Sequence, residues 1–245
     1  MSKNLELLNQ LEKERRNPVA TYAPEPDITT PPGARPNVGT RTYDELNKLV
    51  QRLFLSGRTA SRHVVFTGAG RSVGCTWICV HAAQVLCCQT ARSVCVVDAN
   101  MGSPGIREHF NVPNGPGFAD AMAQQDGPMH TFAQRAGSNL WVVSAGGSSA
   151  VDVVFPGPRV AARLLELSNQ FDHVLVDGPP VAANSGFFAL VTSAEGVVLV
   201  LKAGHTRRPA VRRAIEELET AGVRALGVVL NQREYPIPEA IYKRL

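Results

Sequence analysis

The sequence predicts an α/β fold in which a mainly parallel sheet lies between two layers of helices, a three-layer sandwich. Short β-branched runs recur along the chain, and helical stretches separate most of them. These runs are apolar throughout, which is typical of parallel strands covered on both faces. At 245 residues the chain is long enough for one such domain with a substantial core.

The first 40 residues are predicted to be separate from this domain. Residues 4–16 can form a short amphipathic helix, and the prolines of the following stretch deny it a regular helix or a central strand. We therefore expect an N-terminal helix and a proline-rich linker at residues 1–40, and the main domain at residues 41–245.

A second helix is predicted over residues 42–55, "TYDELNKLVQRLFL". Thr42 is the expected N-cap, because its hydroxyl can accept a hydrogen bond from the first turn. Asp44 and Glu45 are expected in that first turn, where the helix dipole favours acidic side chains.

From residue 63 the chain alternates between strands and helices. Strands are predicted at residues 63–68, 93–99, 140–146, 172–180, 196–204 and 225–232, with helices at 158–170 and 207–221. Ligands of such sheets bind beyond the carboxyl ends of the strands. Here those ends are rich in glycine or carry charged and amide side chains, so we expect the functional site at this edge.

The first strand leads into "TGAGRSVGCT", which resembles a phosphate-binding loop. In a working loop, backbone N–H groups cradle phosphates, a lysine neutralises them and a hydroxyl holds magnesium. Gly70, Gly74 and the Thr76 hydroxyl are in place, whereas Cys75 stands where the lysine is needed. Arg71 is the alternative source of positive charge. Losing a charged hydrogen bond costs about 1.5 to 3 kcal/mol, so phosphate binding is expected to be weakened.

All five cysteines fall between this loop and the second strand. Their spacing matches no zinc pattern, and small thiols are ordinary residues of a buried helix and strand. For Cys75 two interpretations stay open: a small residue that fills the place of the lysine, or a redox sensor whose pKa is lowered by the helix N-terminus.

The overall charge and hydropathy exclude some functional classes. The formal net charge is +4, and acidic residues are mixed with the basic ones, so no dedicated nucleic-acid surface is expected. The sequence has no apolar run near the roughly 20 residues that cross a bilayer. Its first residues are charged and lack the apolar core of a signal peptide. We therefore expect a cytoplasmic protein.

Taken in order, the segments "VVFTGAGRSVGCT", "VCVVDANMGSPGIREHFNV", "FDHVLVDGPPV", "GVVLVLKAGHTRR" and "GVVLNQRE" resemble the kinase domain of bacterial tyrosine kinases. These are capsule and exopolysaccharide regulators of the ParA/MinD-like class of P-loop NTPases with deviant Walker motifs. The resemblance covers roughly residues 40–234 and implies that fold for residues 41–245.

The resemblance also implies where the acidic residues of the site lie. The family motif D-x-D-x-R-x-P corresponds to "DANMGSP", in which Asp98 matches the first acid and Pro104 the proline. Asn100 replaces the second acid and Gly102 the arginine. The aspartate of the Walker B motif is matched by Asp177. An amide cannot accept a proton or neutralise a metal ion as a carboxylate does.

From this resemblance, ATP or ADP with Mg²⁺ is the implied but weakened cofactor. The implied nucleotide-binding residues are Gly70, Arg71, Gly74, Cys75, Thr76 and Asn231, the last of which follows the final strand and contacts the base in this class. Thr76, Asp98 and Asp177 are the implied magnesium ligands, and the two aspartates are catalytic if the protein is active. In the alternative interpretation the aspartates cap the helices that follow them and Thr76 is a helix-start hydroxyl.

Two further family features are altered. The E-x-x-R-x-x-R pattern that helps the family form a ring corresponds to Glu45, Lys48 and Gln51, so the final arginine is missing. The tyrosine-rich tail that accepts phosphate is reduced to Tyr235 and Tyr242, among prolines and apolar residues. Assembly into a homo-oligomer and tail phosphorylation are therefore open.

The resulting expectation is a pseudokinase, a degenerate P-loop regulator of capsular or exopolysaccharide synthesis or export that binds and turns over ATP weakly or not at all. The alternative is an active ATP-dependent protein-tyrosine autokinase of the same pathway. The implied partner is an inner-membrane polysaccharide co-polymerase (Wzz-like) or an export component. That partner would hold the protein peripherally at the inner face of the membrane.

Overall fold

The computed structural model describes residues 35–56, 60–124, 127–147, 156–181 and 186–233. The predicted N-terminal helix, most of the predicted linker, and Tyr235 and Tyr242 lie outside these residues. The division of the chain at residue 40 therefore stays a prediction.

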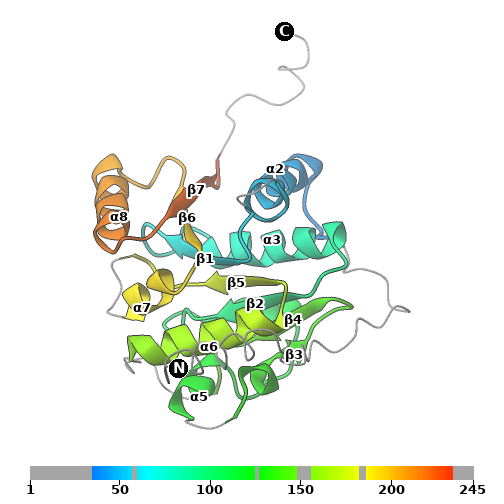
Figure 1. Ribbon diagram of the computed structural model, residues 1–245. Helices are drawn as coiled ribbons and strands as arrows, with labels where there is room; N and C mark the ends of the chain where they lie inside the picture. The colour runs from blue at the N-terminus through cyan, green and yellow to red at the C-terminus, as the bar shows by residue number, and fades with distance from the viewer. Residues whose placement is uncertain (1–34, 57–59, 125–126, 148–155, 182–185, 234–245) are drawn as a thin grey trace, which may run out of the picture.

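A seven-stranded sheet forms the centre of the molecule, in the order β3-β4-β2-β5-β1-β6-β7 (Figure 1). All neighbouring pairs are parallel except β3 with β4. The six predicted strands are confirmed, although several are shorter than expected, and β3 was not predicted. The strands are β1 (His63–Gly68), β2 (Val94–Asp98), β3 (Gln134–Arg135), β4 (Leu140–Val143), β5 (His173–Asp177), β6 (Gly196–Lys202) and β7 (Ala225–Asn231).

Helices cover both faces of this sheet, so the predicted three-layer sandwich is confirmed (Figure 1). One layer contains α2 (Thr40–Val50), the π-helical turn η1 (Gln51–Leu55), α3 (Cys75–Gln89) and α4 (Ile106–Phe110). The other contains α5 (Phe118–Ala123), the 3₁₀ turn η3 (Met129–Phe132), α6 (Gly157–Gln170), α7 (Gly186–Thr192) and α8 (Arg208–Thr220). None of the described helices combines the length and apolarity needed to cross a bilayer.

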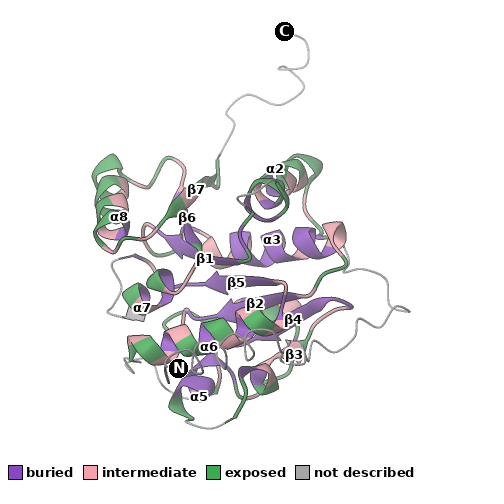
Figure 2. Cartoon of the chain, viewed as in Figure 1, coloured by how far each residue is buried: buried purple, intermediate pink, exposed green. Residues whose placement is uncertain are grey.

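The apolar strands explain this layering. Side chains of β1, β2, β5 and β6 alternate between two buried clusters, one on each face of the sheet. Figure 2 shows these strands buried and β7, at one edge, largely exposed. Cys79 and Cys87 pack in one cluster and Cys95 in the other. The interpretation of these three thiols as core residues is confirmed.

The N-terminal boundary predicted for the second helix is wrong. α2 begins at Thr40 with Gly39 as its N-cap, so Thr42 lies inside the helix and caps nothing. Asp44 and Glu45 consequently fall beyond the first turn. The Arg35 guanidinium lies 3.7 Å above the Tyr43 ring, near this start. The predicted end at residue 55 agrees with the structure, because the π-helical turn η1 continues α2 to Leu55.

Two buried histidines lie at the amino ends of β1 and β5, opposite the edge where the site is expected. Burial lowers the pKa of His63 to about 4 and also lowers the pKa of His173. Neither ring nitrogen of His173 has a hydrogen-bond partner in the described part of the chain, nor has Nε2 of His63. Both rings are therefore held neutral in the folded state.

The buried neutral state of His63 predicts a pH-dependent stability. The pKa of His63 is about 4 in the folded chain and about 6.5 when unfolded, so the unfolded state binds more protons between these values. Lowering the pH from about 7.5 to 5 should therefore reduce the free energy of unfolding of the wild type by about 2 kcal/mol more than that of His63→Phe. Urea unfolding of both proteins at the two pH values measures the difference. His205→Phe, at an exposed position, is the control and should lose as much stability as the wild type. An equal loss in His63→Phe and in the wild type would contradict the prediction.

Candidate functional site

The candidate site lies at the carboxyl ends of β1, β2 and β5, as the sequence predicts. Asp98 and Asp177 end the adjacent strands β2 and β5 and are direct partners in the sheet register. The loop that follows β1 joins them from the other side, since Phe66 pairs with Asp177. The end of β7 contributes Asn231. The fold therefore brings together the loop, both aspartates and the amide.

The loop after β1 folds back so that Val73 lies against Gly68, the last residue of the strand. Ser72 and Gly74 adopt left-handed backbone conformations, with φ of 57° and 81°. Val73 is only 6% exposed and lies over Gly68, where an added Cβ would come within 2.6 Å of its Cγ2 atom. The valine thus anchors the loop to the core. In the described part of the chain, the N–H groups of Gly74, Cys75 and Thr76 have no acceptor, so a cradle for an anion remains.

Asn231 holds this loop in place. Its Nδ2 donates a hydrogen bond of 2.9 Å to the carbonyl of Val73. An added Cβ on Gly74 would come within 2.3 Å of the same nitrogen, so the glycine is needed both for its conformation and for this close approach. The edge strand is thereby tied to the loop. This structural role was not predicted, and a contact of Asn231 with a base stays a prediction.

Asp177 has one buried side-chain oxygen, Oδ1, without a hydrogen-bond partner among the described residues. The Thr76 hydroxyl donates a 2.5 Å hydrogen bond to the other oxygen, Oδ2. Burial raises the pKa of Asp177 to about 7, and the nearby Asp98 carboxylate adds to this increase. Near neutral pH, Asp177 is therefore poised between its neutral and charged forms.

Asp98 is occupied by the backbone that follows it. Its Oδ2 accepts hydrogen bonds from the N–H groups of Gly105 (3.0 Å) and Ile106 (3.1 Å), and its Oδ1 accepts one from Asn100 (3.3 Å). Ile106 begins α4, so the carboxylate caps that helix, as the alternative interpretation expected. Burial raises the pKa of Asp98 to about 6, while these hydrogen bonds oppose the increase.

Cys75 begins α3 directly before Thr76. Burial, and then the Asp177 carboxylate, raise the pKa of its thiol well above the ordinary value. The prediction of a low-pKa sensor thiol at this position is therefore wrong. The helix N-terminus favours a thiolate, but desolvation and a nearby negative charge outweigh it.

The remaining predicted residues lie around this centre. Arg71 is exposed in the loop, and it forms no hydrogen bond or salt bridge with the residues described. Asn100 is half-buried and Gly102 and Pro104 are exposed in the segment before α4. On α2, Lys48 forms an exposed 2.8 Å ion pair with Glu45.

The site offers ligands for Mg²⁺ and N–H donors for a phosphate, but it lacks the lysine that normally neutralises the phosphate. The Thr76 hydroxyl and the unpartnered Oδ1 of Asp177 are oxygen ligands suited to Mg²⁺, with Asp98 beside them. The free N–H groups suit a phosphate. Because the lysine position holds the neutral thiol of Cys75, the cradle lacks the charge that such a loop normally supplies.

The fold and this loop together define the fold class, which is that of the ParA/MinD-like P-loop NTPases. The structure is similar to that of the MinC:MinD cell division complex of Aquifex aeolicus, with a TM-score of 0.59 and 21% identity over 74% of this chain and 71% of that chain. The predicted fold class is thereby confirmed. No family profile matches the sequence.

Within this class the relatives are bacterial tyrosine kinases. The sequence is 27% identical over 170 residues to the tyrosine-protein kinase ptk of Acinetobacter johnsonii, covering 69% of this chain and 23% of that protein. The structure is similar to that of the chimerical protein CapA2B2, with a TM-score of 0.67 and 20% identity over 78% of this chain and 85% of that chain. The predicted resemblance is confirmed. The chain spans less than a quarter of the length of its Acinetobacter relative.

The unpartnered carboxylate predicts a stabilising substitution. The pKa of Asp177 is raised to about 7 in the fold, so stability present at low pH is lost as the pH rises through that value. In Mg²⁺-free buffer at about pH 8, Asp177→Asn should therefore raise the free energy of unfolding by on the order of 3 kcal/mol. The gain should vanish near pH 4. Urea unfolding measures it, with the exposed Asp44→Asn as control, and a variant less stable than the wild type at pH 8 would refute the prediction.

Proposed function

We propose that the protein is a degenerate P-loop regulator of capsular or exopolysaccharide synthesis or export, with weak or absent ATP binding and turnover. The observation that carries this proposal is the pair formed by Cys75 and Asp177. Where the loop needs an ammonium group, a thiol of raised pKa lies beside a carboxylate of raised pKa. Neither group supplies positive charge to a phosphate.

The hydrogen bonds of Asp98 support the same proposal. Three backbone N–H groups already satisfy its oxygens, and Asn100 replaces the second acid of the motif. The site thus has no lysine in the loop, and Asp177 is its one carboxylate with an unpartnered oxygen among the described residues. Stabilising transition-state charge with a cation is worth about 10³ to 10⁵ in rate, so turnover should suffer more than binding.

The relatives support the pathway and the partner in this proposal. They include the putative tyrosine-protein kinase CapB of Staphylococcus aureus, and the similar chimera joins CapA and CapB in its name. We infer a membrane polysaccharide co-polymerase (Wzz-like) or an export component as the partner, which would hold the protein peripherally at the inner face of the membrane. Recovery of such a protein after cross-linking in native membranes tests this part.

Restoring the missing charge should restore phosphate binding. Cys75→Lys is expected to tighten Mg-ATP binding by about 10 to 100-fold, because a charged hydrogen bond contributes about 1.5 to 3 kcal/mol. Cys88→Lys is the matched control. It adds the same charge to the same helix about 20 Å away and should change nothing.

Isothermal titration calorimetry with Mg-ATP measures both variants beside the wild type. Micromolar binding by the wild type, accompanied by phosphate transfer, would defeat the proposal. Equal binding by the wild type and Cys75→Lys would show that the thiol is not the limiting feature.

The second candidate function is an active ATP-dependent tyrosine autokinase. It is favoured by the retained Thr76, Asp98 and Asp177 at the ends of three adjacent elements. In this case labelled γ-phosphate should enter Tyr235 or Tyr242, and Asp177→Ala should abolish the label. No incorporation in the presence of the membrane partner would remove this candidate.

A further inference from the structure

Among the described residues, the edge of the sheet at β7 is open and apolar. β7 is the last strand in the sheet order and pairs only with β6 among the described strands. Its sequence, "ALGVVLN", contains no proline and no charged residue. Val228 and Leu230 are 52% and 54% exposed. Native proteins normally protect an edge with charges, proline or a covering element, so this edge needs a partner.

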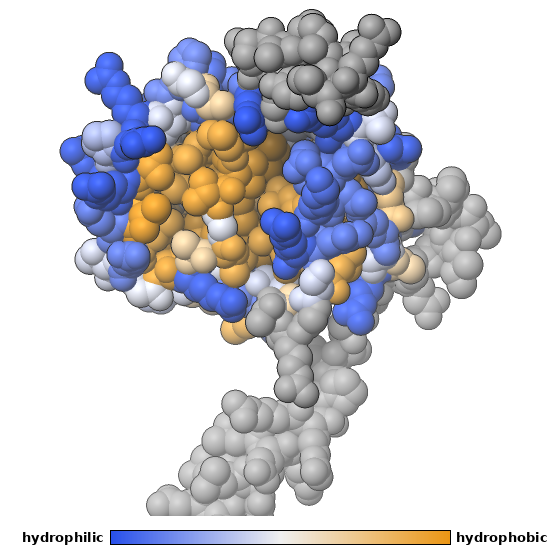
Figure 3. Space-filling model, turned by 90° about the horizontal axis from the view of Figure 1, so that it is seen from above, coloured by the Kyte–Doolittle hydropathy of each residue, from blue (hydrophilic) through white to orange (hydrophobic). Residues whose placement is uncertain are grey.

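A hollow apolar surface surrounds this edge. Figure 3 looks down on the β7 side of the molecule and shows a continuous hydrophobic area with hydrophilic residues on both sides. In Figure 1, α8 and α2 flank β7 on this side. Leu55, at the end of the helical segment that begins with α2, is also 40% exposed. Continuous exposed apolar areas of this kind mark interaction surfaces.

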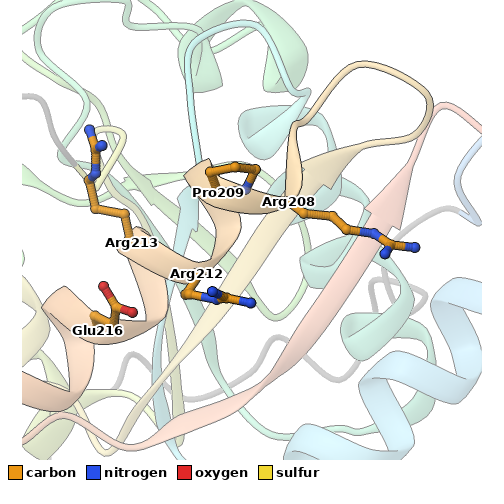
Figure 4. A pocket seen from close by; sticks show the side chains of 5 residues that line it. All are labelled: Arg208, Pro209, Arg212, Arg213 and Glu216. Carbon is orange, nitrogen blue, oxygen red and sulfur yellow. The ribbon is translucent and has the colours of Figure 1, made fainter.

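The charges on α8 indicate what covers the edge. Arg208, Arg212 and Glu216 are spaced four residues apart and therefore lie along one stripe of the helix. All three line one surface pocket of about 250 Å³, together with Pro209 and Arg213 (Figure 4). The stripe is basic in the first half of the helix and acidic in the second. None of the three forms a salt bridge with a described residue.

The charges of this stripe complement those of a second copy of α8 that runs in the opposite direction. The helix runs antiparallel to β7 and has about the same length, roughly 20 Å. A two-fold axis perpendicular to the sheet and near Val228 would therefore be level with the middle of the stripe along the strand direction. This operation places Arg208 and Arg212 of one copy opposite the acidic half of the other. It also places β7 beside its own copy in antiparallel orientation, and every pair of facing side chains is then uncharged.

We propose that the β7 edge is the interface between two copies of this chain, joined by antiparallel β7 strands into one continuous sheet. The pairing satisfies the free backbone groups of both edges and buries Val228 and Leu230. It also juxtaposes Arg212 with Glu216 of the partner copy twice, once on each side of the axis. This interface is independent of the nucleotide site and stands whether or not ATP binds.

The oligomeric state of the full chain tests the interface. Sedimentation velocity at roughly 50 μM is expected to give a dimer, and Val228→Lys should give a monomer because it places like charges on the axis. Leu165→Lys is the matched control, since Leu165 is an equally apolar and even more exposed residue (62%) on α6. It should leave the dimer intact. A monomeric wild type, or a dimer that persists in Val228→Lys, would overturn the proposal.

Charge exchange tests the orientation. Arg212→Glu and Glu216→Arg should each raise the dimer dissociation constant at least about tenfold, because like charges then face each other. The double variant should restore the wild-type value. Thermal unfolding of the dilute monomers shows whether α8 itself is affected. Unchanged association in both single variants would exclude the antiparallel arrangement.

A photo-cross-linking benzoylphenylalanine at position 228 identifies the occupant of the edge directly. Cross-links between residues 225–231 of two copies, absent when the probe is at position 165, support the proposal. Cross-links within one chain to residues 234–245, or only to a different protein, would overturn it.

Discussion

The burial of Asp98 and Asp177 side by side, with no salt bridge to any described residue, is the constraint on which the site depends. An ionised carboxylate away from water needs a positive charge or several hydrogen bonds. Asp98 has three backbone N–H donors, while Asp177 has the hydroxyl of Thr76 and one oxygen without a partner. The two aspartates therefore differ in how completely they are hydrogen-bonded. Asp98 is hydrogen-bonded through both oxygens, whereas Asp177 keeps one oxygen without a partner among the described residues.

Cys75 makes this arrangement compatible with a folded, unliganded chain. A lysine at this position would place an ammonium group beside Asp177 and favour its charged form. The thiol supplies no positive charge, and burial raises the pKa of Asp177 to about 7, so this carboxyl is partly neutral near physiological pH. The site therefore needs less counter-charge than two ionised carboxylates would.

The sequence predicted the sheet well because most of its strands are continuous apolar runs, which are typical of a sheet covered on both faces. It failed for α4, α5, α7 and β3, which are short and depend on contacts from distant parts of the chain. At the start of α5, for example, the N–H groups of Phe118 and Ala119 donate hydrogen bonds to the carbonyls of Ser144 and Ala145.

The site was predictable in position but not in chemistry. Parallel strands necessarily bring their carboxyl ends together, so the meeting of Asp98, Asp177 and the loop could be foreseen. Whether a helix N-terminus or burial decides the pKa of Cys75 depends on how much of the thiol is desolvated, which no motif encodes. Likewise, Asn231 could be placed beside the loop, but its bond to Val73 follows from the left-handed backbone at Gly74. That bond ties the last residue of β7 to the phosphate-binding loop.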